Sequence, residues 1–156
     1  LRYLNLIITT VIIHDMDKNS LPHWFYVYDE SLDISRVTNM SLVSGSKSSG
    51  LVMQFETFRR DDEDYNLDDV FYTIKESIKV ILNKKNIDHI SIKHTFCKYS
   101  YVVPTLATNS NRCRILDFLK SNDILSSGIY GTWKYMWSDS AYFSGKDLAV
   151  QENLSK

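Results

Sequence analysis

LRYLNLIITTVIIH, residues 1–14, is the stretch that most constrains the fold. Its Leu, Ile, Val, Thr and Tyr residues favour strands, and such a nearly continuous apolar run is typical of a central strand. The strand-like run begins at once and no Met precedes Leu1, so we expect the chain to be part of a longer protein. Asn5, Thr9 and Thr10 interrupt the run, and no apolar run reaches the roughly 18–20 residues of a membrane span. We therefore expect no membrane-spanning segment.

Outward from this strand, the chain predicts strands and helices without a regular alternation. Further strands are expected at residues 24–28, 33–40, 51–58 and 87–103, and helices at residues 67–81, 109–120 and 140–154. Residues 124–131 contain two glycines and predict a short strand or a turn, and SGSKSSG at residues 44–50 predicts a flexible loop. The irregular order argues against a doubly wound parallel sheet. The predicted fold class is α+β, a largely antiparallel sheet with two to three helices packed on one side.

The clearest single element is the helix expected at residues 67–81. Asn66 is a favourable N-terminal cap, and Asp68 and Asp69 follow it near the positive end of the helix dipole. The apolar side chains fall at the three- and four-residue spacing that places them on one face: Leu67, Val70, Phe71, Ile74, Ile78 and Ile81.

Composition bounds the class of protein. The 156 residues carry 18 basic and 19 acidic side chains, a formal net charge of −1, and 44% of them are hydrophobic. This is enough apolar side chain for a core, and the lack of a basic excess indicates no nucleic-acid partner. Cys97 and Cys113 have neither CxxC spacing nor a disulfide-rich pattern, which favours a reducing, cytoplasmic setting.

Common catalytic and metal-binding motifs are missing from the sequence. It contains no GxGxxG dinucleotide fingerprint, and no GxxxxGK[ST], HExxH or GxSxG motif. His89 and His94 lie five residues apart in a strand-like region, so strand alternation predicts that they point to opposite faces. The acidic run at residues 61–64 lacks the register of a calcium loop and is typical of a solvated loop. We expect no metal site.

Three aromatic-rich clusters carry the functional signal: residues 23–39, 99–106 and 128–145. In the first, Trp24 can stack on a flat ring or a sugar face, and Arg36 can hold a phosphate with two donors. Tyrosine hydroxyls of the other clusters can bond phosphate oxygens, and the glycines of the third allow a backbone to approach a ligand closely. This inventory suits an anionic, ring-containing ligand such as a nucleotide sugar, although an aromatic-rich core has a similar composition.

Taken in order along the chain, these clusters resemble a known family. YSYVVPTL at residues 99–106, the helix after it, and GIYGTWKY at residues 128–135 are similar to the C-terminal part of eukaryotic-type UDP-galactopyranose mutases and their amine-oxidase-like bacterial relatives. The resemblance covers residues 24–150. It implies a protein that binds FAD through an N-terminal Rossmann-type domain, for which this sequence has no fingerprint, and a sheet that roofs the flavin and holds the substrate.

The resemblance also implies roles for individual residues. Trp24 is similar to the family's aromatic residue near the sugar, and Arg36, twelve residues later, is similar to the arginine that clamps the diphosphate. Tyr101 and Tyr135 are similar to the two tyrosines that donate hydrogen bonds to the diphosphate. On this basis the substrate would be a nucleotide sugar used in surface polysaccharide biosynthesis.

Several positions depart from the family pattern. Asp139 stands where the family commonly has Asn near the diphosphate, and a carboxylate there should repel phosphates. Ile129 stands where the family has the arginine of Gly-Arg-aromatic-Gly, which removes a charge-assisted contact worth about 1.5–3 kcal/mol. Val102 and Val103 replace part of the Tyr-Pro-x-Pro pattern. Mutase activity on UDP-galactose therefore does not follow from the resemblance alone.

The resemblance divides the chain into two functional parts. Residues 1–125 are expected to form the substrate-binding domain, and residues 126–156 to return toward the FAD domain, with Gly128 and Gly131 on the cofactor side. The isolated chain is expected to be inactive, because the flavin carries the chemistry. A face that meets the flavin domain would be exposed in the isolated chain and could drive assembly into a homo-oligomer.

Three functions remain open at this point. The first is the substrate domain of a flavin-dependent nucleotide-sugar mutase. The second is the substrate domain of an amine-oxidase-like oxidoreductase, which a site without phosphate-binding cations would favour. The third is a non-catalytic binding module.

Overall fold

The structure is a computed structural model that describes residues 2–43 and 50–154. The loop predicted at residues 44–50 lies outside the described residues except for Gly50, which begins a strand. The chain divides into two compact units. We call Leu4–Tyr101 the sheet unit, and Leu1–Tyr3 together with Val102–Lys156 the helical unit.

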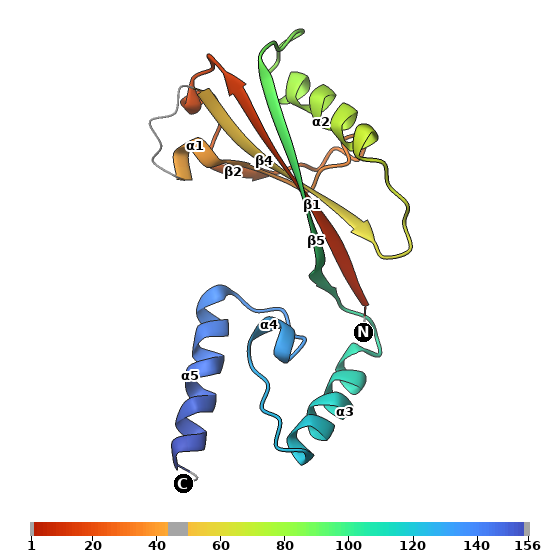
Figure 1. Cartoon of the computed structure of the whole chain (residues 1–156), viewed down its shortest axis with the longest axis vertical. Coiled ribbons are helices and arrows are strands. Elements are labelled where there is room, and N and C mark those ends of the chain that lie inside the picture. The colour runs from red at the N-terminus through yellow and green to blue at the C-terminus, as the bar shows by residue number, and fades with distance from the viewer. Residues whose placement is uncertain (1, 44–49, 155–156) are drawn as a thin grey trace. The chain divides into compact units, whose positions relative to one another are not determined.

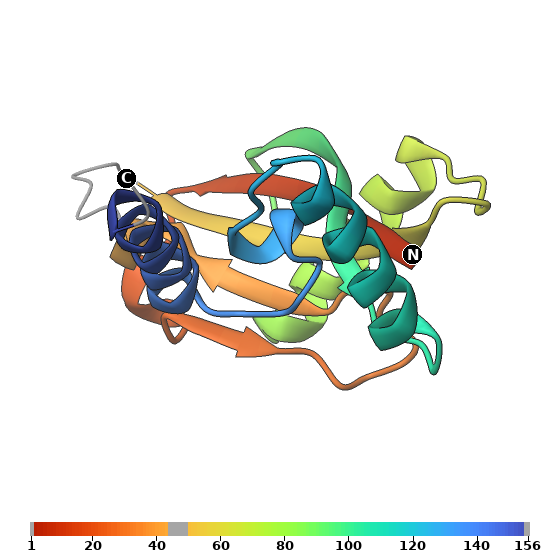
Figure 2. The same cartoon turned by 90° about the horizontal axis from the view of Figure 1, so that it is seen from below.

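The sheet unit is built on a five-stranded sheet with the order β2-β3-β4-β1-β5. The strands are β1 (Arg2–His14), β2 (Trp24–Tyr26), β3 (Arg36–Asn39), β4 (Gly50–Arg60) and β5 (Ile90–Val103). Figure 2 shows β1, β4, β3 and β2 side by side in this order from top to bottom. The pairs β1–β4, β4–β3 and β3–β2 are antiparallel. This confirms the predicted α+β class and its antiparallel sheet.

Strand β1 lies between β4 and β5, so the prediction of an interior strand is confirmed. Its contacts with β5 indicate that the two strands are antiparallel, because residues near the end of β1 meet residues near the start of β5. The His14 Nε2 atom lies 3.2 Å from Ser91 Oγ, and Asn5 Oδ1 accepts a hydrogen bond of 3.3 Å from the Tyr99 backbone N–H. Residues 90–103 form one long strand, where the sequence suggested several. Tyr99 has φ 58, which departs from extended geometry within the strand without ending it.

Helix α2 (Leu67–Ile81) covers one face of this sheet, as Figure 1 shows. Asn66 caps it as predicted, because its side chain accepts a hydrogen bond of 2.9 Å from the Asp68 backbone N–H. Ile74 and Ile78 are fully buried among core residues of the strands. The apolar face predicted from the sequence is wider than the buried face in the first turns of the helix, since Leu67 and Phe71 are 45% and 40% exposed. One narrower stripe of α2 therefore seals the core.

Alternation along the strands gives the sheet two different faces. Odd-numbered residues of β1 and β4, such as Ile7, Val11 and Phe55, are fully buried on the α2 side. Even-numbered residues from Leu4 to Ile12 in β1 and from Val52 to Phe58 in β4 are half-buried and point to the opposite side. We call this second side the open face.

Two small elements close the end of the sheet. The 3₁₀ turn η1 (Lys18–Ser20) is capped by Asp17, and α1 (Met40–Val43) follows β3 directly. Buried Asn39 ties them together, because its Nδ2 donates hydrogen bonds of 2.7 and 3.2 Å to the carbonyls of Lys18 and Leu21. This clasp holds the segment that leads into β2.

The helical unit contains α3 (Thr108–Ser121), α4 (Gly128–Gly131) and α5 (Ser138–Leu154). Helices predicted at residues 109–120 and 140–154 are thus confirmed within two residues at each end. Residues 124–131, predicted to be a short strand or a turn, form a loop and then the single turn α4, which packs on α5. Gly128 has φ +72, which favours glycine at the start of this turn.

The helical unit buries little of its own apolar surface. Among its residues whose burial the structure describes, 2–3 and 102–151, Val102 alone is buried. Phe118, Trp137 and Tyr142 are 64%, 71% and 67% exposed. Throughout residues 2–43 and 50–154, no helix has both the length and the apolar character that crossing a membrane requires.

Candidate functional site

The first two predicted site residues lie together on the open face. Trp24 and Tyr26 alternate along β2, and their rings meet edge to face with centroids 5.4 Å apart. Arg36 lies directly opposite Tyr26 in the β2–β3 pair, and Thr38 lies opposite Trp24. Paired residues in antiparallel strands point to the same face, so the aromatic and cationic side chains lie next to each other. Trp24 and Tyr26 are each about half exposed, which leaves their rings available to a ligand.

Arg36 is engaged by a carboxylate. It lies opposite Glu56 in the β3–β4 pair, its Nε donates a hydrogen bond of 3.1 Å to Glu56 Oε1, and its Nη2 donates to the same oxygen. This hydrogen bond raises the pKa of the Arg36 guanidinium, which stays charged at any physiological pH. The side chains are 40% and 18% exposed, so the pair borders solvent. The net charge it presents to a ligand is therefore near zero.

Tyr101 lies farther along the same unit, near the end of β5. Its ring meets the Phe58 ring edge to face, with centroids 5.7 Å apart. Phe58 is an even-numbered residue of β4 and belongs to the open face. The open face thus carries aromatic side chains from the first two predicted clusters, Trp24 from residues 23–39 and Tyr101 from residues 99–106.

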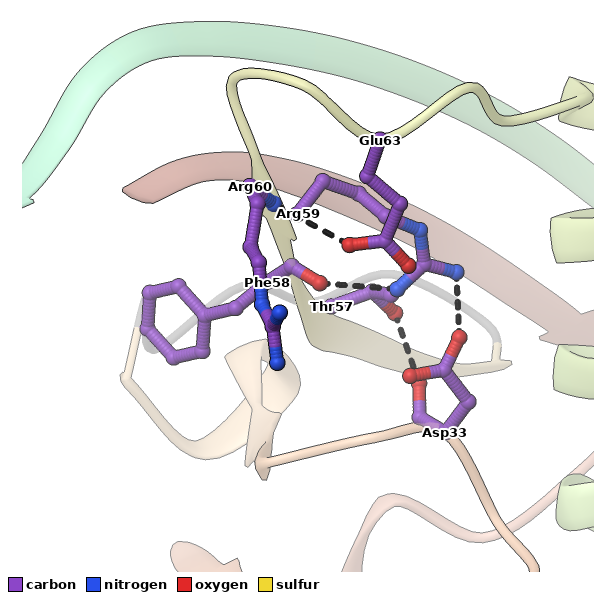
Figure 3. Close-up of polar contacts among 6 residues, drawn as sticks. All are labelled: Asp33, Thr57, Phe58, Arg59, Arg60 and Glu63. Carbon is purple, nitrogen blue, oxygen red and sulfur yellow. Dashed lines mark hydrogen bonds and ion pairs between the residues drawn. The ribbon is translucent and has the colours of Figure 1, made fainter. Parts of the chain in front are cut away.

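An acidic cavity of about 470 Å³ lies beside Phe58. The connection between β2 and β3 supplies Asp29, Glu30 and Asp33 to its lining. Asp33 pairs with Arg59, whose Nη1 also donates a hydrogen bond of 2.7 Å to the Phe58 carbonyl. Figure 3 shows Arg59 reaching Asp33 on one side of β4 while the Phe58 ring points to the other. The pair holds the β2–β3 connection against β4.

The cavity rim has one carboxylate with a perturbed acidity. Ser31 donates hydrogen bonds to Asp29 Oδ1 from its hydroxyl, at 2.6 Å, and from its backbone N–H, at 3.0 Å. The hydroxyl contact, with the backbone contact second, lowers the pKa of Asp29. Asp29 is therefore ionised at neutral pH, and the cavity is suited to a cationic or neutral group more than to a phosphate.

The remaining predicted residues lie in the helical unit. Tyr135 lines a cavity of about 770 Å³ together with Arg112 of α3 and Lys134 and Trp137 of the α4–α5 connection. Asp139 is exposed in the first turn of α5. Among the buried polar atoms that the structure describes, Arg112 Nε has no hydrogen-bond partner. The lining thus has two cations beside a tyrosine against one carboxylate, that of Asp147, and the excess of cations suits an anion.

The backbone conformation requires glycine at one of the two predicted glycine positions but not at the other. Gly128 needs its positive φ, and a side chain there would meet nothing within 4 Å. A Cβ at Gly131 would lie 3.6 Å from the backbone of Ser126, an ordinary contact. Ile129, in place of the family arginine, is half-buried within α4. Trp24, Arg36 and Tyr101 thus belong to the sheet unit, whereas Tyr135, Asp139 and both glycines belong to the helical unit.

The prediction for the histidines is wrong. His89 and His94 both line one cavity together with α2 residues, where opposite faces of the sheet were expected. His89 precedes β5 and has φ 56, so strand alternation does not apply to it. In contrast, residues 61–64 are exposed, as expected of a solvated loop. Within the described part of the chain, no three His, Cys, Asp or Glu side chains are grouped to hold a metal ion.

Sequence reasoning also missed residues that shape the open face. Glu56 is the most important, because it sets the charge around Arg36. Tyr26 and Phe58 provide the rings beside Arg36 and Tyr101. The signal was available in the sequence: if the predicted strands at residues 33–40 and 51–58 are paired so that opposite charges face each other, Glu56 lies opposite Arg36.

Comparison with known proteins supports the fold. Neither a protein-family model nor a curated protein sequence matches the chain. Among solved structures, a reduced UDP-galactopyranose mutase superposes with a TM-score of 0.70 over 86% of this chain, at 16% identity. A putative protoporphyrinogen oxidase from Exiguobacterium sp. 255-15 superposes with a TM-score of 0.68 over all of it, at 13% identity.

These likenesses show a shared fold at low sequence identity. The chain spans 29% of the mutase structure and 36% of the oxidase structure. The fold implied by the resemblance of residues 24–150 is thus found in solved structures of a mutase and of a putative oxidase. What either protein acts on does not transfer to this chain by fold alone.

Proposed function

We propose that this chain is the substrate-side part of an FAD-dependent enzyme similar to UDP-galactopyranose mutase, and that it binds a ring-containing substrate. The observation that carries the proposal is the group formed by Trp24, Tyr26 and Arg36 on the open face. A stacking ring beside a bidentate donor is the combination that recognises a sugar or base attached to a phosphate. A nucleotide sugar is the substrate class we place first.

The proposed roles follow the chemistry of each side chain. In the sheet unit, Trp24 stacks on a ring, Arg36 donates to a phosphate, and the Tyr101 hydroxyl donates to a diphosphate oxygen. In the helical unit, the Tyr135 hydroxyl is a donor of the same kind. Asp139 opposes phosphate binding through its charge. Arg112 and Lys134, which line the cavity beside Tyr135, can supply the positive charge that Ile129 does not.

FAD would have to be held mainly by residues outside this chain. The 156 residues contain no glycine-rich strand-to-helix turn for a dinucleotide. Gly128 and Gly131, in the segment at residues 126–156, offer backbone without side-chain bulk and fit one wall of such a site. We derive no reaction step from these residues, because flavin supplies the redox or nucleophilic chemistry when it is bound.

A second candidate is an oxidoreductase that acts on an amine or an uncharged ring. It is favoured by the pairing of Arg36 with Glu56 and by the acidic cavity lined by Asp29, Glu30 and Asp33. Together these give the substrate side little free positive charge. An amine substrate would gain from the carboxylates that a diphosphate must avoid.

The first experiment is the visible absorption spectrum of the complete protein that carries this chain, under reducing conditions with and without UDP-galactose. A flavin spectrum that UDP-galactose perturbs supports the mutase proposal. A flavin spectrum that is indifferent to it supports the oxidoreductase. A complete protein that binds no flavin would leave only a non-catalytic module.

Two substitutions then separate the substrate classes. For a nucleotide sugar, Arg36→Ala is expected to weaken binding about tenfold, and Glu56→Gln to strengthen it, because the first removes a phosphate donor and the second a competing carboxylate. For an amine, Glu56→Gln is expected to weaken binding. Isothermal calorimetry on the complete protein measures both, with exposed Arg114→Ala as the matched control. Unchanged binding in Arg36→Ala would remove Arg36 from the site.

A further inference from the structure

A separate cavity lies on the α2 side of the sheet, opposite the open face. Its volume is about 420 Å³, and it lies within the sheet unit where α2 meets the beginning of β5. Phe71 and Ile92 give it apolar walls, whereas Lys75, His89 and His94 give it polar groups. We call it the helix–strand cavity. Its size falls within the range of small-molecule sites, and it belongs to neither of the substrate surfaces described above.

Local structure explains why these side chains converge. Phe71 and Lys75 are four residues apart on α2 and therefore lie on the same side of the helix. Ile92 and His94 are two residues apart on β5 and point to the same face of the sheet. His89, which has φ 56 just before the strand begins, also lines the cavity. Helix and strand thus each contribute one apolar and one polar group.

Neighbouring contacts fix the His94 ring and the His89 backbone. The His94 Nδ1 atom lies 2.9 Å from the hydroxyl of Thr9, which is fully buried in β1. Because Nδ1 is engaged there, Nε2 is the ring nitrogen that remains for a ligand in the cavity. The His89 carbonyl accepts a hydrogen bond of 3.2 Å from the His14 backbone N–H, which fixes the backbone at His89. The His94 ring is therefore held before any ligand arrives, and the backbone that carries His89 is fixed beside it.

Charge and apolar surface together define what fits. Lys75 is a permanent donor, His89 and His94 can each present an N–H, and Asp88 is the one carboxylate of the lining. Three donors against one carboxylate suit an anion more than a cation. Phe71 is 40% exposed at the cavity, so a ring or branched chain attached to the anion would cover apolar surface that water now contacts.

We propose that the helix–strand cavity binds a small organic phosphate, with the phosphate at Lys75, His89 and His94 and an apolar ring against Phe71 and Ile92. This site lies on the other side of the sheet from Trp24 and Arg36 and does not depend on the flavin or on the substrate assigned above. It would give the sheet unit a second ligand.

Histidine NMR of the 156-residue chain tests the proposal directly, because the sequence has only four histidines. The probe is phenyl phosphate. Inorganic phosphate, which lacks the ring, and benzyl alcohol, which lacks the phosphate, test the two parts of the ligand separately. Ring resonances of His89 and His94 are expected to shift saturably with phenyl phosphate, while those of His23 stay constant. His23 is a suitable internal reference, since it precedes β2, at the opposite edge of the sheet from β5.

Two variants and a control locate the ligand. Lys75→Gln is expected to weaken phenyl phosphate about tenfold by removing a charged donor, and Phe71→Ala to weaken phenyl phosphate but not inorganic phosphate. Lys93→Gln, on the opposite face of β5 from Ile92, should change neither affinity. Shifts at all four histidines, no saturable shift, or equal binding in Lys75→Gln would each overturn the proposal. Unchanged circular dichroism of each variant confirms that its fold is intact.

Discussion

The sheet unit and the helical unit both contain many apolar side chains, but among the residues whose burial the structure describes the sheet unit buries eleven of them and the helical unit only Val102. Phe55, Ile7 and Ile74 are completely enclosed between the strands and α2. In the helical unit, Phe118 and Trp137 leave most of their surface exposed. Helices satisfy most of their backbone hydrogen bonds internally, but their stability in water comes mainly from the packing of their apolar side chains. The difference teaches that the sheet unit can stabilise itself, whereas the helical unit presents surface suited to a partner.

The strongest test of this comparison removes one phenylalanine from each unit. Phe55→Ala is expected to lower the free energy of unfolding by about 3–5 kcal/mol, because it leaves a cavity in a closed core. Phe118→Ala, the matched control on α3, should change it by less than about 0.5 kcal/mol in the isolated chain. Urea unfolding followed by circular dichroism measures both. Equal losses in the two variants would mean that the units do not differ in the way described.

A smaller effect is expected at a buried polar contact of the sheet unit. Asn39→Ala removes the hydrogen bonds to the carbonyls of Lys18 and Leu21 and should cost about 1–3 kcal/mol. The matched control is Asn122→Ala in the helical unit, whose Nδ2 donates to the Phe118 carbonyl at an exposed position. Thermal unfolding compares the two. A larger loss for Asn122→Ala would reverse the assignment of the stabilising contacts to the sheet unit.

A still smaller effect is expected at the open face. Glu56→Gln breaks the ion pair with Arg36 but should lower stability by less than about 1 kcal/mol, because the pair borders solvent. Glu76→Gln, which breaks the pair with Lys79 on α2, is the control in a more exposed pair, since the Glu76 side chain is 41% exposed and that of Glu56 is 18% exposed. Urea midpoints at low and high salt measure both. A loss of several kcal/mol for Glu56→Gln would show that the pair is a structural centre and not a part of a binding surface.

The smallest effect is a change of acidity at the loop beside the open face. Hydrogen bonds from Ser31 lower the pKa of Asp29, so Ser31→Ala should move this pKa upward, toward that of an ordinary aspartate. A carboxyl whose folded pKa is lowered favours the folded state above its unfolded pKa, and this contribution disappears as the pH falls through the folded value. Carboxyl carbon NMR from pH 2 to pH 6 follows the titration. An unshifted Asp29 titration in Ser31→Ala would exclude Ser31 as the cause.

Elements with strong local patterns were predictable from the sequence. The spacing from Val70 to Ile78 defined α2, and Asn66 marked its beginning. The apolar run of residues 2–14 defined β1 as an interior strand. In these segments local preference and burial point to the same structure, which is why a single sequence is sufficient.

Features that depend on distant pairing were not predictable. The Arg36–Glu56 contact depends on the register of β3 against β4, and that register is set by buried odd-numbered residues such as Val37 and Phe55. The joint placement of His89 and His94 depends on a left-handed residue that alternation does not describe. The aromatic clusters predicted ring-rich surfaces, but whether Trp24 and Tyr135 act on one ligand stays a prediction.

The placement of β1 has a kinetic consequence. Its hydrogen bonds to β5 join residues separated by 77, 85 and 94 positions in the sequence. Closing such long loops costs chain entropy before the contacts form, so folding of the sheet unit should be slow, in the range of milliseconds to seconds. Until β4 and β5 arrive, the apolar face of β1 is uncovered and can pair with other chains. The strand that organises the native sheet is therefore also the segment most exposed to aggregation during refolding.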